Sequence, residues 1–186
     1  DLDIRFKLIG RVVERIALVR LLGRTGSPRA SALLLELAGH DDPALELAVV
    51  EALGTLRVEG PEVDAVLLAA LDDEDVALRG AAARAIGAVG KDDAAAKLLH
   101  RLSVAADQDR VALGIGLSGA LSRSTDPALA TAVDGLLASA PATVRDALIE
   151  GLGRMPVPEA GQVLAKLRRS SDPDDRRKAA EALIGH

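Results

Sequence analysis

The sequence has no cysteine, tryptophan or tyrosine, and its single aromatic residue is Phe6. Without cysteine the chain can form neither a disulfide nor a thiolate metal site, and without aromatic side chains it lacks a platform for stacking nucleic-acid bases. The longest run without a charged residue is residues 111–122, which is too short to span a bilayer. We therefore expect a cytoplasmic protein without a membrane span, and nucleic acid is not the expected partner.

Catalytic motifs are also missing. The three histidines, His40, His100 and His186, are not followed by glutamate in a metal-binding pattern, and no serine lies in G-x-S-x-G. We predict that the protein is not an enzyme and that it binds no cofactor, metal or small-molecule ligand.

The residues that are present favour helices and an uneven charge. Apolar residues make up 49% of the 186 residues, and nearly all are Ala, Leu, Val and Ile. The net charge is +4 over residues 1–30, −10 over residues 31–80 and +1 over residues 81–186. A basic partner segment is therefore expected to prefer residues 31–80.

An internal repeat of about 32 residues organises the chain. Its anchors recur every 31–34 residues, at Gly23, Gly54, Gly87, Gly119, Gly153 and Ile184. A leucine lies 16 or 17 residues before each anchor from Gly54 onward. Each unit is predicted to be a pair of helices, and the second helix carries the anchor. The predicted repeats, within a single domain, are 26–57, 58–90, 91–122, 123–155 and 156–186.

Residues 1–25 fit the repeat less well. They are predicted to form an irregular N-terminal helix or half of a truncated repeat, and the ends of the chain suggest a domain excised from a larger protein. The basic side chains of this segment, such as Arg5, Lys7 and Arg11, could contact phosphate or nucleic acid, or could pair with the acidic repeats beside them.

Acidic turns separate the predicted helices, at residues 40–43, 72–75, 107–109 and 171–175. Aspartate there can accept hydrogen bonds from the free N–H groups that begin the next helix, and its charge suits the helix dipole. Proline at the first helical position explains Pro28, Pro43, Pro61, Pro127, Pro158 and Pro173. With no alternating strand pattern, the fold class is all-α.

The second helices resemble those of HEAT-like repeats of the bacterial kind that also occurs in phycobilisome lyases. Residues 75–79 with Ala82, Ala85, Ile86 and Gly87 carry the resemblance best. It departs at Glu46 and Val111, where the family pattern has arginine. The resemblance implies a right-handed α-solenoid of about five helix pairs, whose second helices line a concave face.

The stretch GIGLSG, residues 114–119, matches the dinucleotide-binding pattern G-x-G-x-x-G. That pattern requires a buried strand before the glycines, whereas VAADQDRVAL has no strand character. We interpret the stretch as part of the fourth second helix, bendable because it holds Gly114, Gly116 and Gly119.

Charged residues recur at two positions of the second helices, three and eight residues before the anchor (positions −3 and −8). They could form a structural ladder of ion pairs between repeats or a docking face for a partner. The predicted partner-binding residues at these positions are Arg15, Arg20, Glu46, Glu51, Arg79, Arg84, Gly116, Arg145, Glu150 and Glu181.

The pattern favours a protein-binding scaffold or adaptor that presents its second-helix face to another protein. Two alternatives stay open: a subunit or relative of a chromophore-lyase-like enzyme, and a phosphate or nucleic-acid contact through the basic N-terminal helix.

Overall fold

The computed structural model describes residues 12–39, 42–90 and 92–184, and these fold into eleven helices without a strand. The chain divides into two compact units, Asp1–Val89 and Gly90–His186. Unit 1 holds α2 (Val12–Gly23), α3 (Pro28–Leu37), α4 (Pro43–Leu56), α5 (Pro61–Leu71) and α6 (Val76–Val89). Unit 2 holds α7 (Asp92–Val104), α8 (Asp107–Leu121), α9 (Pro127–Leu137), α10 (Ala142–Arg154), α11 (Pro158–Leu167) and α12 (Pro173–Ile184).

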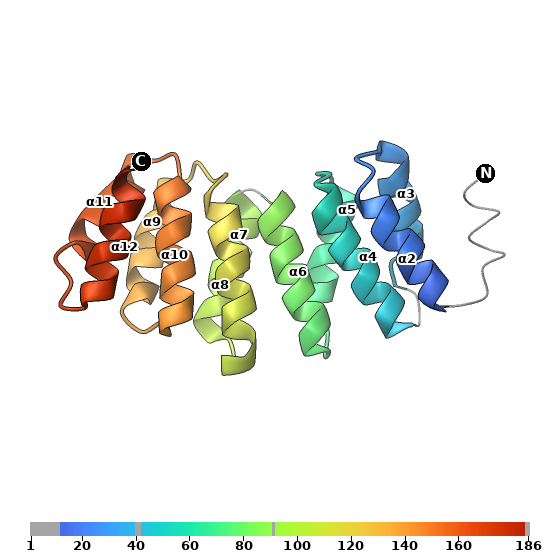
Figure 1. Cartoon of the computed structure of the whole chain (residues 1–186), viewed down its shortest axis with the longest axis horizontal. Coiled ribbons are helices and arrows are strands. Elements are labelled where there is room, and N and C mark those ends of the chain that lie inside the picture. Colours follow the sequence, from blue (N-terminus) through green and yellow to red (C-terminus); the bar gives the residue numbers. More distant parts are fainter. Residues whose placement is uncertain (1–11, 40–41, 91, 185–186) are drawn as a thin grey trace. The chain divides into compact units, whose positions relative to one another are not determined.

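The predicted all-α repeat fold is confirmed, since helix pairs follow one another along the described chain. In unit 1, the second helices α4 and α6 and the preceding helix α2 pack side by side, and α3 and α5 cover them from behind (Figure 1). Unit 2 has the same two layers, with α8, α10 and α12 in one and α7, α9 and α11 in the other. The single domain and the handedness of the array stay predictions.

Helix starts follow the predicted capping chemistry. The side chain of Asp42 accepts hydrogen bonds from Ala44 N and Leu45 N, and that of Asp126 accepts one from Ala128 N. Six helices, α3, α4, α5, α9, α11 and α12, begin at the predicted prolines Pro28, Pro43, Pro61, Pro127, Pro158 and Pro173. The turn at 107–109 differs, because Ala106 is the cap of α8 and no side chain caps it. Asp107 and Asp109 lie in the first turn instead, where their charge suits the helix dipole.

Glycine at the anchors lets neighbouring second helices touch backbone to backbone. A Cβ atom added at Gly54 of α4 would lie 2.7 Å from Ala85 Cβ of α6. One added at Gly23 would lie 2.8 Å from Ala52 Cα, and one at Gly153 would lie 2.7 Å from Ala182 Cβ. In each case the residue contacted lies two positions before the next anchor. The anchor glycines are therefore packing residues that set the spacing of the second helices.

Hydrogen bonds connect the start of α7 to the turn before α9 within unit 2. The buried hydroxyl of Ser124 donates to Asp92 Oδ1 at 2.6 Å, and Thr125 N donates to the same oxygen at 3.0 Å. The hydrogen bond from Ser124 is the largest of the causes that lower the pKa of the Asp92 carboxyl below its usual value. This network fixes one repeat against the next at the helix ends.

Two glycines of unit 2 allow the effect of glycine on helix packing to be measured separately from its low helix propensity. A Cβ atom at Gly151 would lie 2.8 Å from Ser118 Cα, a backbone atom that cannot move by itself. Gly135 is exposed in α9, and nothing lies within 4 Å of an added Cβ atom. We predict that Gly151→Ala lowers the free energy of unfolding by about 1–3 kcal/mol. Gly135→Ala is expected to raise it by up to about 1 kcal/mol, because alanine favours the helix.

Urea denaturation followed by circular dichroism measures both changes. A stabilised Gly151→Ala variant would contradict the packing role.

Candidate docking surface on the second helices

Three predicted site residues lie on neighbouring second helices of unit 1 at position −3. Arg20 of α2 is exposed, and its Nη2 atom lies 3.8 Å from Glu51 Oε2 of α4. Arg84 of α6 is exposed, and it has no ion-pair partner among the described residues. The predicted ladder of alternating charge is therefore formed between α2 and α4 only.

A groove with a volume of about 570 Å³ lies between α4 and α6. Its lining comprises Glu51, Gly54, Thr55, Arg57, Ala81, Arg84, Ala85 and Ala88. The contact between Gly54 and Ala85 places only small side chains along its length, so charged and polar side chains form its edges. Two predicted site residues, Glu51 and Arg84, thus line one groove.

Position −8 of α4 places a carboxylate next to another carboxylate. Glu46 is half-buried, and its carboxylate has no hydrogen-bond or cationic partner among the described residues. Burial raises the pKa of the Glu46 carboxyl above its usual value, and the negative charge of Asp73, in the turn before α6, raises this pKa further. Arg79 contacts this turn through its backbone, since its Nη1 donates to Asp73 O at 2.9 Å and to Glu74 O at 2.8 Å.

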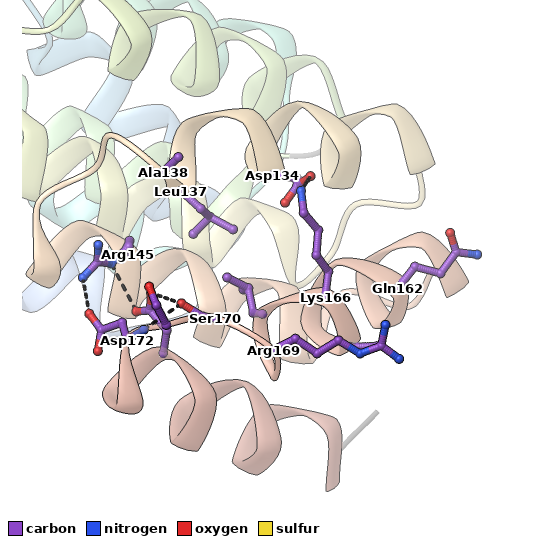
Figure 2. A pocket seen from close by; sticks show the side chains of 13 residues that line it. Asp134, Leu137, Ala138, Arg145, Gln162, Lys166, Arg169, Ser170 and Asp172 are labelled. Carbon is purple, nitrogen blue, oxygen red and sulfur yellow. Dashed lines mark hydrogen bonds and ion pairs between the residues drawn. The ribbon is translucent and has the colours of Figure 1, made fainter.

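The residue at position −8 of α10 is Arg145, which places a cation, rather than a carboxylate, next to the following acidic turn. Arg145 Nη2 lies 3.1 Å from Asp172 Oδ2, and Arg145 Nε lies 3.2 Å from Asp175 Oδ1 without the alignment of a hydrogen bond. Asp175 is buried, and its other oxygen faces the hydroxyl of Ser170 at 3.5 Å (Figure 2). An arginine at position −8 thus joins α10 to the acidic turn and first residues of α12.

These side chains form one end of a hollow of about 920 Å³ in unit 2. The ion pair between Lys166 and Asp134, at 2.6 Å, lies on its other side, near Gln162 (Figure 2). Arg169 also lines the hollow, so its charged groups are three cations and three carboxylates. Most of them are already paired, which makes this hollow a less suitable place for a charged partner.

Most of the remaining charges on α10 and α12 pair with one another. Glu150 lies 3.3 Å from Arg154, and Glu181 lies 2.9 Å from Arg177, each one turn along its own helix. Lys178 of α12 pairs with Asp146 of α10. The predicted site residues Arg145, Glu150 and Glu181 are therefore all engaged within the unit.

The structure differs from the sequence alignment at α8, where the anchor shifts by one residue. Gly151 contacts Ser118, so Ser118 takes the place that the alignment gave to Gly119. Gly116 consequently lies at a packing position and is buried, and Ile115 takes position −3 with 49% of its surface exposed. Gly116 is therefore not part of the exposed face.

The shift also restores an arginine to position −8. Arg110, rather than Val111, occupies it, and its Nε donates to Ala105 O at 3.2 Å. Arg176 of α12 behaves in the same way, with Nη1 donating to Ser170 O and Ser171 O. The departure from arginine expected at Val111 therefore results from the misplaced anchor of the sequence alignment. At position −8 of α4 the residue is Glu46, so this repeat does depart from arginine.

The basic N-terminal segment is described only in part. Arg5, Lys7 and Arg11 lie outside the described residues, as do His40 and Asp41 of the first acidic turn. Arg15 is half-buried in α2, and Arg20 pairs with Glu51 as described above. The contact with Glu51 is of the kind expected if this helix pairs with the acidic repeat beside it.

Two features of the described residues bear on metal binding and membrane insertion. Within them, no group of three or more His, Asp or Glu side chains is arranged to hold a metal ion. None of the described helices has the length and apolar character needed to cross a membrane.

The family comparison agrees with this geometry, because residues 11–76 match the model of HEAT repeats. The chain has the all-α helical repeat fold that armadillo and HEAT-like proteins share. It is similar in structure to a designed armadillo repeat protein, with 16% identity, a TM-score of 0.59 and coverage of 95% of this chain and 94% of that one. A further designed armadillo repeat protein, solved in complex with the peptide (KR)4, has 15% identity, a TM-score of 0.60 and coverage of 91% and 90%.

An engineered protein has 18% identity and a TM-score of 0.58, with coverage of 97% of this chain and 94% of its own. At these identities the likeness shows the fold alone, which is typical of protein-binding scaffolds. No curated protein gives a significant sequence match. The resemblance to bacterial and phycobilisome-lyase repeats stays a prediction.

The raised pKa of Glu46 gives the stability of this protein a specific pH dependence. Since the folded state holds the proton more tightly than the unfolded state, ionised Glu46 costs stability above its folded pKa, and the cost disappears below its unfolded pKa. We predict that Glu46→Gln raises the free energy of unfolding at pH 7 by up to about 1 kcal/mol and leaves it unchanged near pH 3.

Urea denaturation at both pH values measures the difference, with Glu36→Gln on the exposed surface of α3 as the control. Equal stabilisation at both pH values would contradict the role assigned to the charge.

Proposed function

We propose that the protein is a non-catalytic protein-binding module, and that the second helices of unit 1 dock a partner segment that carries basic residues. One observation carries the proposal: the predicted site residues Arg145, Glu150 and Glu181 of unit 2 are ion-paired within the unit, whereas Glu46, Arg57 and Arg84 of unit 1 have no ion-pair partner among the described residues.

The chemistry of position −8 supports a basic partner. Arg145 meets the carboxylates of Asp172 and Asp175, but in α4 a carboxylate meets the acidic turn that contains Asp73. A lysine or arginine supplied by another protein would balance the charges of Glu46 and Asp73, as Arg145 does within unit 2. The segment of residues 31–80, with its net charge of −10, surrounds this point.

The comparison with designed proteins supports the same class of ligand. The designed armadillo repeat protein in the peptide complex shares this fold and was solved with a peptide of alternating lysine and arginine. We infer from the charges of unit 1, rather than from that likeness, that this protein also takes a basic segment.

The test uses a fluorescein-labelled (Lys-Arg)4 peptide and the full chain, with binding measured by fluorescence anisotropy. We predict that Glu46→Arg weakens binding by at least about tenfold. The same change should leave the protein as stable as before or more stable, because the new arginine can pair with Asp73. Higher ionic strength should weaken the binding of the unaltered protein.

Glu159→Arg, on α11 of unit 2, changes the net charge by the same amount and is expected to leave the dissociation constant nearly unchanged. If both variants lose affinity equally, only overall charge attracts the peptide and the proposed site is wrong.

A further inference from the structure

The groove between α4 and α6 carries positive charge, and Glu46 lies outside its lining, toward the start of α4. Arg57 follows α4 in a left-handed backbone conformation, with φ of 55°, and lines the groove together with Arg84 of α6. Neither guanidinium has an ion-pair partner among the described residues. The nearby carboxylate of Glu51 is in contact with Arg20 of α2, at 3.8 Å. The C-terminal ends of these two helices therefore present unpaired cations.

The helix pair α4 and α6 has two charged ends, Glu46 with Asp73 near its start and the groove residues Arg57 and Arg84 near its end, and an extended chain can match the distance between them. Arg84 lies at position −3 and Arg57 three residues beyond the anchor, whereas Glu46 lies at position −8. With a rise of 1.5 Å per residue, the separation along the helices is about 8–16 Å. An extended peptide covers this distance in about three to five residues.

Within the groove, the side chains between the charged residues are small. Gly54, Ala81, Ala85 and Ala88 line the groove, and the hydroxyl of Thr55 is turned to its own helix, where it donates to Glu51 O at 2.9 Å. A peptide backbone can therefore approach the helices closely, and its side chains can reach both charged ends.

We propose that the segment docked along α4 and α6 is an extended chain with both charges, in which an aspartate or glutamate enters the groove and contacts Arg57 and Arg84, and a lysine or arginine three to five residues away contacts Glu46 and Asp73 beyond the groove. This inference rests on the proposed function and adds to it an acidic residue at a fixed spacing. The fit is one of charge complementarity at both ends of this helix pair, with the cations in the groove and the carboxylates outside it.

Three six-residue peptides with blocked ends test the spacing, titrated into the isotope-labelled full chain and followed by NMR. In the first, four serines separate lysine from glutamate; in the second, of identical composition, lysine and glutamate are adjacent; in the third, four serines separate two lysines. We expect the first to bind at least about fivefold more tightly than either of the others, with shifts of the amide signals of Glu46, Arg57 and Arg84.

The Arg84→Glu variant provides a second test, whose expected result could not arise from a damaged fold. In this variant the peptide with two lysines should bind more tightly than the peptide with lysine and glutamate, which is a gain of binding. An unchanged order of affinities in this variant, or equal binding of the first two peptides, would overturn the inference. If lysine-containing peptides shift Glu46 whatever their second charge, the inference fails while the proposed function stands; if none shifts it, both fail.

Discussion

The contact of an anchor glycine with a small residue on the next second helix is the constraint on which the other features depend. Because no Cβ atom separates Gly54 from Ala85, or Gly153 from Ala182, the helix backbones meet directly. Such a contact fixes the spacing of the helices and also how far each can slide or turn against its neighbour. The side chains on either side of it, including those at positions −3 and −8, are thereby placed next to their counterparts on the adjacent helix.

α8 shows how strictly this constraint sets the exposed surface. A shift of one residue turns a helix by about 100° relative to its neighbour, enough to exchange a buried residue for an exposed one. With Ser118 as the contact to Gly151, the buried Gly116 and the exposed Ile115 follow directly. The position of Arg110, which donates to the carbonyl of Ala105, follows from the same shift. The glycines of GIGLSG are thus part of the packing of a helix, and Gly114 lies against Val144.

Sequence alone predicts the features that depend on local chemistry. Proline and aspartate at helix starts, the spacing of the leucines and the recurring anchors determine the helices and their pairing. The register of α8 could not be predicted, because Gly119 fits the spacing of the anchor glycines and only the contact of Gly151 with Ser118 shows that the anchor is the serine before it. Glu46 was visible in the sequence as a departure from arginine. That it meets Asp73, while Arg145 meets Asp172 and Asp175, depends on contacts between repeats that no single repeat encodes.

The contrast between Arg145 and Glu46 separates the two roles that a charged residue can have at position −8. A buried carboxylate such as Asp175 requires a cation beside it, since desolvation would otherwise disfavour its charge, and Arg145 therefore belongs to the structure of unit 2. Glu46 contributes no such pairing and adds like-charge repulsion to an exposed acidic turn. An ion-pair ladder that served stability alone would have the same sign pattern in every repeat. A repeat that lacks the ion pair at position −8 keeps a net charge on its surface. Because no described residue neutralises that charge, a second molecule can pair with it.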